Sequence, residues 1–82
     1  MPLRTLLVAG TKEGTWVRSY ELPIAPFPGL GIRLDTYDVV NVIDVLVGDP
    51  RFEVTCIVGA EKGQTLTPVI LERLRFEQAP YP

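Results

Sequence analysis

Apolar and β-branched residues alternate with polar residues along most of this chain, a pattern typical of half-buried β-strands. The alternation predicts a first strand over Leu3–Ala9 and a second over Thr15–Leu22. The segment 10–14 between them begins and ends with glycine, which supplies the positive φ angles of a hairpin turn. Three prolines between residues 23 and 28 each lack a backbone donor, so an extended crossing loop is expected over 23–31.

The strongest strand signal covers Tyr37–Val47 and follows a short strand expected at Ile32–Leu34. Its odd-numbered positions are apolar except for Asn41 and are expected to face the core, whereas the even-numbered face is half apolar and carries two aspartates. A proline turn then leads into Phe52–Val58, which alternates cleanly and predicts the partner strand of a second hairpin. The inward residues of that strand are expected to be Phe52, Val54, Cys56 and Val58.

The C-terminal part of the chain allows two interpretations. Thr67 and Pro68 are suited to the N-cap and the first position of a helix, and Ile70, Leu71 and Leu74 then share one helical face. A short helix within 67–76 is therefore favoured over the alternative of a sixth strand. Residues 59–64 are expected to form a polar loop, and residues 79–82 a loosely held tail.

Taken together, these elements predict one domain over residues 1–82. Its length of 82 residues lies within the usual range of a single domain and leaves no room for two cores. The expected fold is mainly β, a small and partly open antiparallel barrel of about five strands, because closure limits the exposed edges of short strands.

Composition excludes several classes of function. The chain has no histidine and one cysteine, so it cannot build a Ser/His/Asp triad, a Cys/His dyad, an internal disulfide or a usual four-ligand zinc site. The inward Cys56 is expected to be an unreactive thiol. The spacing of the carboxylates supports no acid/base pair. No catalytic residue, metal or cofactor is assigned, although an enzyme whose site is shared between subunits remains a third alternative.

The charge balance bears on the choice of partner. Eight Lys and Arg residues against ten Asp and Glu residues give a net charge of −2, and Arg73 and Arg75 form no continuous basic patch with Arg4 in the sequence. Nucleic acid and anionic membranes are therefore not expected as partners. The apolar runs are too short to span a bilayer, and the protein is expected to be cytoplasmic.

The apolar content of 46% and mean hydropathy of +0.20 are high for such a short chain. Since a small domain cannot bury all of its apolar surface, a homo-oligomer or a protein partner is expected. The favoured function is therefore a non-enzymatic interaction module that self-associates through strand edges or through the partly apolar even face of the Tyr37–Val47 strand. The expected contacts are Val40, Val42, Leu46 and Ile57.

A second hypothesis rests on Trp16, Arg18 and Tyr20, which share one face of the second strand. An aromatic and arginine stripe of this kind can stack a flat ligand or a single-stranded base. The alternative is that the two aromatic residues belong to the core and that Arg18 extends its charged end to solvent.

The segment from Thr15 to Val58 resembles small SH3-like β-barrel proteins of unknown function from bacteria, phages and mobile elements. The resemblance lies in Glu21-Leu22-Pro23, in the proline and glycine residues between Pro26 and Gly31, and in Tyr37-x-Val39-Val40-x-Val42 before a strand-turn-strand unit. It implies an SH3-like barrel and an adaptor role, and it carries no catalytic residues.

Overall fold

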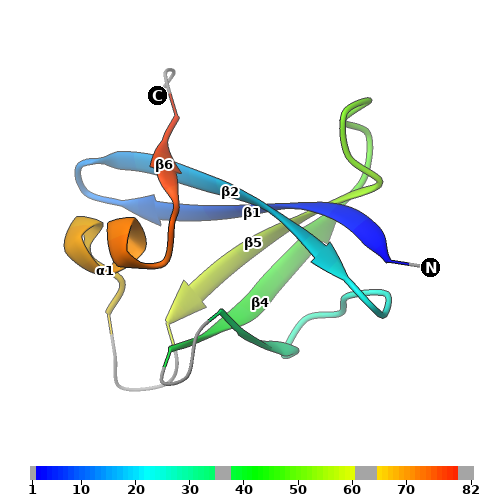
Figure 1. Ribbon diagram of the computed structural model, residues 1–82, viewed down its shortest axis with the longest axis horizontal. Helices are drawn as coiled ribbons and strands as arrows, with labels where there is room; N and C mark the ends of the chain where they lie inside the picture. Colours follow the sequence, from blue (N-terminus) through cyan, green and yellow to red (C-terminus); the bar gives the residue numbers. More distant parts are fainter. Residues whose placement is uncertain (1, 35–37, 61–64, 80–82) are drawn as a thin grey trace.

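The computed structural model describes residues 2–34, 38–60 and 65–79 of the chain. Its elements in chain order are β1 (Leu3–Thr11), β2 (Gly14–Leu22), β3 (Gly31–Arg33), β4 (Val39–Leu46), β5 (Val54–Ala60), α1 (Pro68–Arg73) and β6 (Glu77–Gln78). All six strands belong to one sheet in the order β3-β4-β5-β1-β2-β6 (Figure 1). The prediction of a small, mainly β domain is confirmed, but β3 and β6 are unjoined edges and the sheet is not closed into a barrel.

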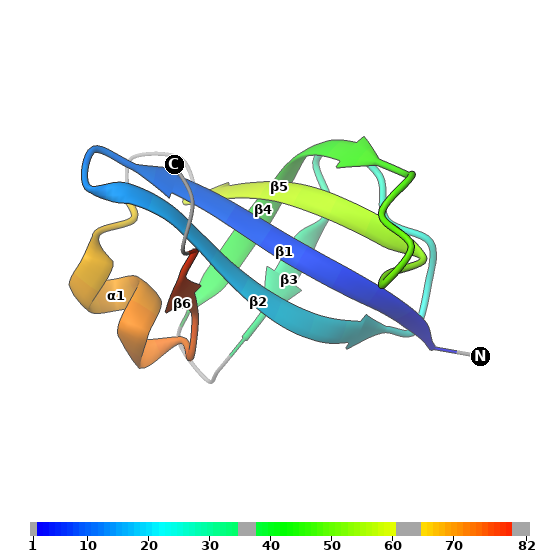
Figure 2. The same cartoon turned by 90° about the horizontal axis from the view of Figure 1, so that it is seen from above.

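Two hairpins build most of the sheet. The β1–β2 hairpin turns between Thr11 and Gly14, whose φ of 138° is accessible to glycine and to few other residues. The β4–β5 hairpin joins it through β5, which runs parallel to β1 with Thr5 opposite Val54 (Figure 2). The expectation of an antiparallel sheet is therefore wrong at this central pair, because the chain crosses over between β2 and β3 and brings β5 to β1 in the same direction.

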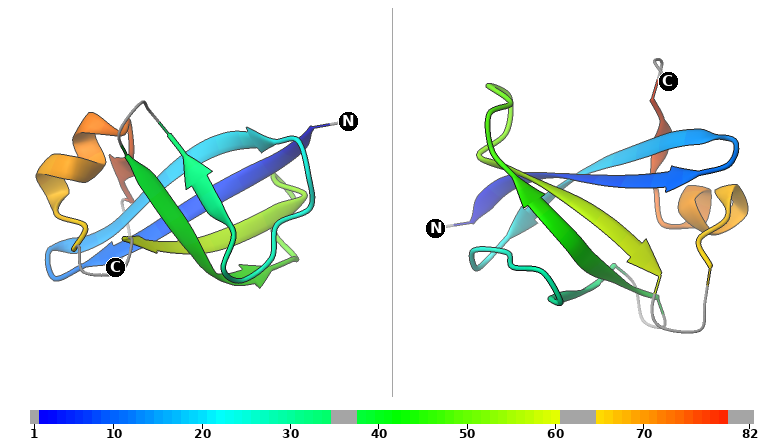
Figure 3. Two further views of the ribbon diagram at one scale, coloured as in Figure 1. Left: turned by 90° about the horizontal axis from the view of Figure 1, so that it is seen from below. Right: turned by 180° about the vertical axis from the view of Figure 1, so that it is seen from behind.

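The core lies inside the curve of the sheet, and α1 covers one end of it (Figure 3). Burial is most complete on the inner positions of β1 and β5, where Leu7, Ala9 and Cys56 are 0% exposed. The helical segment contributes Leu71, Leu74 and Phe76, which are also buried. The burial expected for Val54, Cys56 and Val58 is confirmed, whereas Phe52 is only half-buried and precedes the strand.

The C-terminal helix begins where the sequence predicts it. The Oγ1 atom of Thr67 accepts a hydrogen bond from the backbone N–H of Ile70 at 3.3 Å, and Pro68 occupies the first turn. The helical interpretation is thus confirmed over Pro68–Arg73.

The helix ends in a Schellman motif. The N–H groups of Arg75 and Phe76 donate to the carbonyl oxygens of Glu72 and Leu71, respectively. This arrangement requires a left-handed residue, and Arg75 adopts a φ of 67° at the position that glycine usually occupies. Phe76 then packs into the core, and the chain continues into β6.

The inward face of β4 differs from the prediction. A β-bulge shifts the pairing with β5 between Val42 and Asp44, so that the even positions face the core before the bulge and Val45 packs against it afterwards. The Asp44 carboxylate supports the bulge by accepting the N–H of Val45 at 2.9 Å. Asn41 is half-buried on the opposite side from Val40 and Val42, so the expected inward position of Asn41 is wrong.

Element ends also differ in places. β5 continues to Ala60, so the loop expected from residue 59 starts later, and residues 61–64 lie outside the described part of the chain. β4 begins at Val39, whereas the predicted start at Tyr37 falls on a residue that is not described. Within the expected tail, Ala79 donates its N–H to the carbonyl oxygen of Thr15 at 2.8 Å; residues 80–82 are not described.

Candidate functional site: an arginine-lined strand edge

The site is the edge of β2 that faces away from β1. β6 pairs with only the first part of this edge, at Trp16 and Val17, and the carbonyl oxygen of Thr15 accepts the N–H of Ala79. Every second residue of a strand turns its backbone N–H and carbonyl groups to the same edge, so the backbone groups of Ser19 and Glu21 point to the same side as those of Thr15. Among residues 2–34, 38–60 and 65–79, no strand pairs with this later part of the edge. It offers backbone donors and acceptors to a further strand.

Depressions surround this open edge on both sides of the sheet. On the outer side, two cavities of about 510 and 450 Å³ share Ser19, Arg51 and Phe52. At the opening between β2 and β3, a cavity of about 300 Å³ lies between Arg18 and Leu34, and an apolar one of about 260 Å³ lies between Leu22 and Ile32. The edge is therefore accessible from several directions.

All six arginines of the chain line these four cavities. They are Arg4, Arg18, Arg33, Arg51, Arg73 and Arg75. The acidic residues in the same linings are Glu21 and Glu77. A protein with a net charge of −2 thus concentrates its arginines around one strand edge. Such an edge favours an anionic ligand, because arginines outnumber carboxylates in these linings and an excess of positive charge attracts anions.

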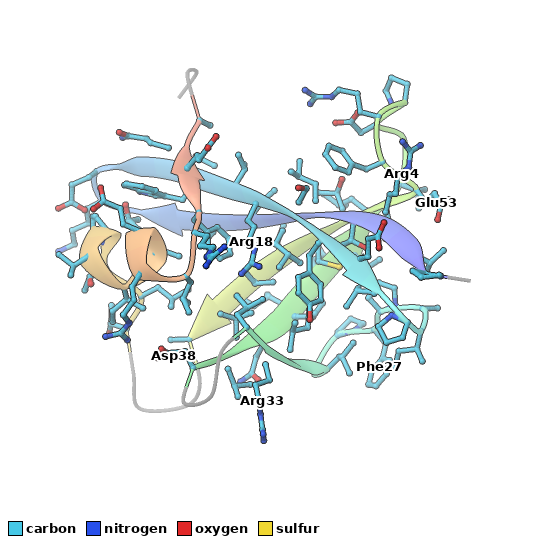
Figure 4. The ribbon with its side chains drawn as sticks, in the orientation of Figure 1. Arg4, Arg18, Phe27, Arg33, Asp38 and Glu53 are labelled. Atoms are coloured by element: carbon cyan, nitrogen blue, oxygen red, sulfur yellow. The ribbon has the colours of Figure 1, made fainter. Side chains whose placement is uncertain are left out.

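Arg18 is held in place by contacts on two sides. Its Nη1 atom donates to the carbonyl oxygen of Leu74 at 2.8 Å, and its guanidinium carbon lies 5.4 Å from the centre of the Tyr20 ring. Figure 4 shows Arg18 between the β2 ribbon and the end of the sheet that carries Asp38 and Arg33. A guanidinium fixed in this way loses less conformational entropy when it binds a further anion.

Two other arginines form ion pairs at the rim. Arg73 donates to Asp38 with nitrogen to oxygen distances of 3.0 and 3.1 Å, which connects α1 to the start of β4. Arg51 forms a two-bond contact with Asp49 at 3.0 and 3.2 Å. The hydrogen bonds from Arg51 lower the pKa of the Asp49 carboxyl below its ordinary value. Both pairs lie at the surface and mainly orient the arginines, since exposed ion pairs add little stability.

The structure separates the predicted aromatic and arginine stripe. Trp16 is a core residue, 6% exposed, and its buried indole N–H has no acceptor among the described residues. The prediction that Trp16 stacks a ligand is wrong, because its ring is buried in the core. Arg18 and Tyr20 are half-buried at the open edge and remain candidate binding residues.

The predicted interface also divides into two groups. Val40 is 0% exposed and Val42 is 2% exposed, so neither can form a contact surface while the fold is intact. This correction follows from the phase of β4 before its bulge, where the even-numbered side chains face the core. Leu46 is 48% exposed and Ile57 is half-buried, on the outer side of the sheet. Their role as interface residues stays a prediction.

Sequence reasoning missed the gathering of the arginines, since they come from β1, β2, β3, the β4–β5 turn and the helix end. One local signal was present. Arg75 follows a helix at a position where glycine is strongly preferred, and a non-glycine residue there is an unusual feature that points to its side chain.

Residues 2–34, 38–60 and 65–79 contain no group of three or more His, Cys, Asp or Glu residues placed to hold a metal ion. Burial raises the pKa of the Cys56 thiol above its ordinary value, which disfavours the reactive thiolate. In this part of the chain no helix has the length and apolar character needed to cross a membrane.

The chain was compared with protein-family models, with curated proteins and with solved structures, and none of the three comparisons gives a match.

Proposed function

We propose that this protein is a non-enzymatic binding module that holds an anionic partner at the open edge of β2. The observation that carries the proposal is that all six arginines line cavities around a part of β2 that pairs, at its outer edge, with no strand among the described residues. An interaction module is also what the SH3-like resemblance implies. The proposal moves the binding surface from the predicted face of β4 to β2.

Arginine suits this role better than lysine. Its planar guanidinium presents paired donors that match the two oxygens of a carboxylate or phosphate. Arg18 is anchored to Leu74 and Arg73 to Asp38, so that part of the ordering of these side chains precedes binding. Tyr20 and Phe52 add apolar surface beside the charges.

The test is fluorescence anisotropy with labelled polyglutamate, polylysine and single-stranded oligothymidylate. We expect at least one anionic probe to bind and polylysine not to bind. Binding should weaken between about 50 and about 300 mM salt, because added ions screen the interaction. The variant Arg73→Gln/Arg75→Gln should reduce affinity by roughly tenfold or more, since each lost charge-assisted contact has a substantial free energy.

Lys12→Gln is the matched control for loss of positive charge. Lys12 is exposed in the β1–β2 turn and lines none of the four cavities around the β2 edge. Unchanged affinity in this variant would assign the effect to the edge rather than to net charge. Failure of every anionic probe to bind would refute the proposed function.

Self-association is a second candidate function, supported by exposed apolar side chains in and just after β4. Ile43 and Leu46 lie in the strand and Val47 follows it, and Val47 is 81% exposed. Exposed apolar groups that adjoin one another mark contact surfaces more often than scattered ones. Light scattering over a range of concentrations tests this candidate independently of the arginine site.

A further inference from the structure

We infer that the occupant of the β2 edge is the free C-terminal end of an extended partner polypeptide, bound as an additional strand antiparallel to β2. This inference rests on the proposed function and names its ligand. It follows from the direction of β6, from the turn that precedes β6 and from the distribution of charge along the edge.

The direction is set by the existing neighbour of β2. β6 runs antiparallel to β2, with Glu77 opposite Val17 and Gln78 opposite Trp16. A guest strand in the same line and direction would pass Glu21 first and Ser19 second. Its backbone would bond to groups that have no strand partner among the described residues. Strand addition of this kind gives affinity through main-chain hydrogen bonds.

The turn before β6 stops the guest strand. The backbone of Arg75 has the left-handed conformation, and its N–H donates to the carbonyl oxygen of Glu72. Because of this turn, the residues before Glu77 belong to α1 and do not extend β6 along the edge of β2. An antiparallel guest therefore ends against Arg75, close to Ser19. The cavity of about 300 Å³ beside this point is lined by Arg18, Arg73 and Arg75.

A terminal carboxylate fits this end of the edge. It supplies two oxygens to guanidinium donors and adds a negative charge that an internal peptide bond lacks. A guest running parallel to β2 would instead bring its N-terminal ammonium to the arginines, where like charges repel. The charge distribution thus selects both the direction of the guest strand and its chemical end.

The outer cavities predict side-chain preferences. The guest residue opposite Ser19 points to the outer face, beside Leu6, Val17 and Phe52, and should be apolar. The guest residue opposite Glu21 lies beside the Glu21 carboxylate, with Arg4 on the far side of β2, and should therefore not be acidic. The preferred end is therefore an apolar residue with a free carboxyl group, preceded by neutral residues.

The experiment compares two labelled peptides with the sequence acetyl-Gly-Ser-Thr-Thr-Val, one ending in a free carboxyl group and the other in an amide. We expect the free acid to bind roughly tenfold or more tightly than the amide. Arg75→Gln should remove most of this difference, while Lys12→Gln should leave it unchanged. Addition of the free acid should slow amide hydrogen exchange at Ser19 and Glu21.

Ser19→Pro tests the edge itself. Proline removes the outward N–H of Ser19 and is tolerated on edge strands, so binding should be lost while the circular dichroism spectrum is kept. If this variant does not fold, amide hydrogen exchange at Ser19 of the unaltered protein, with and without the free acid peptide, tests whether the peptide binds at this edge. Equal binding of acid and amide, or unchanged exchange at Ser19, would overturn the inference. Binding of polyglutamate or oligothymidylate without peptide discrimination would leave the proposed function standing and refute only the inference.

Discussion

The guanidinium of Arg18 donates a hydrogen bond to the carbonyl oxygen of Leu74 at 2.8 Å, although 56 positions separate the two residues. Leu74 caps the C-terminal end of α1, where backbone carbonyl groups have no helical partner. A cation at this end also interacts favourably with the helix dipole. One side chain of the open edge therefore also holds the helix against β2, which couples the stability of the fold to the geometry of the site.

Arg18→Ala is expected to lower the free energy of unfolding by about 1–2 kcal/mol, because a charged donor to a partly buried carbonyl is lost. Urea denaturation monitored by circular dichroism measures the change. Arg33→Ala is the control, since Arg33 is exposed and has the same charge. Equal midpoints for the two variants would mean that the Arg18 bond adds no net stability.

Arg75→Gly is expected to raise stability by about 1 kcal/mol and the melting temperature by several degrees, because glycine adopts the left-handed conformation without strain. The same change removes a guanidinium from the cavity beside Leu74, so peptide affinity should fall. Arg73→Gly is the contrasting variant. This variant removes the same single positive charge but places glycine inside the helix, so it should destabilise the protein by roughly 1 kcal/mol. Equal melting temperatures for Arg75→Gly and the unaltered protein would contradict the strain argument.

The sequence predicts those structural features that depend on residues close together in the chain. Alternation locates both hairpins, and the Thr67-Pro68 pair locates the start of α1, because caps and turns are local interactions. The predicted phase of β4 holds at Val45 but is wrong at Val40 and Val42, because the bulge between Val42 and Asp44 reverses which side chains face the core. The arginine site could not be predicted from spacing alone, since sheet order and the Schellman turn bring its residues together.

Val42→Glu should unfold the protein, because it places a carboxylate without a partner at a position that is only 2% exposed. The expected cost of several kcal/mol is comparable with the whole stability of a small domain. Leu46→Glu introduces the same charge on the exposed side of β4 and should leave the fold intact. Circular dichroism distinguishes the two variants. A folded Val42→Glu protein would contradict the buried position of this residue.

Leu46→Glu also tests self-association. If the outer side of β4 forms an interface, this variant should lower the mass measured by light scattering, since a charge at an apolar contact is costly to desolvate. Val69→Glu, which adds the same single charge at an exposed apolar residue of α1, is the control for added negative charge. A mass that stays that of an assembly in Leu46→Glu would exclude Leu46 from the interface.

The Cys56 thiol should make stability depend on pH in the alkaline range. Its side chain is 0% exposed, and burial raises its pKa above the ordinary value of 9.0. Above pH 9.0 the thiol of the unfolded chain loses its proton while that of the folded protein keeps it. The unfolded state then binds fewer protons, so stability should fall as pH rises from there towards the folded-state pKa. The measurement is the difference in urea midpoints between the unaltered protein and Cys56→Ala, which removes pH effects common to both proteins. That difference should change with pH above 9.0 and be constant near neutrality. A difference that does not vary with pH would mean that the thiol ionises as readily in the folded protein as in the unfolded chain.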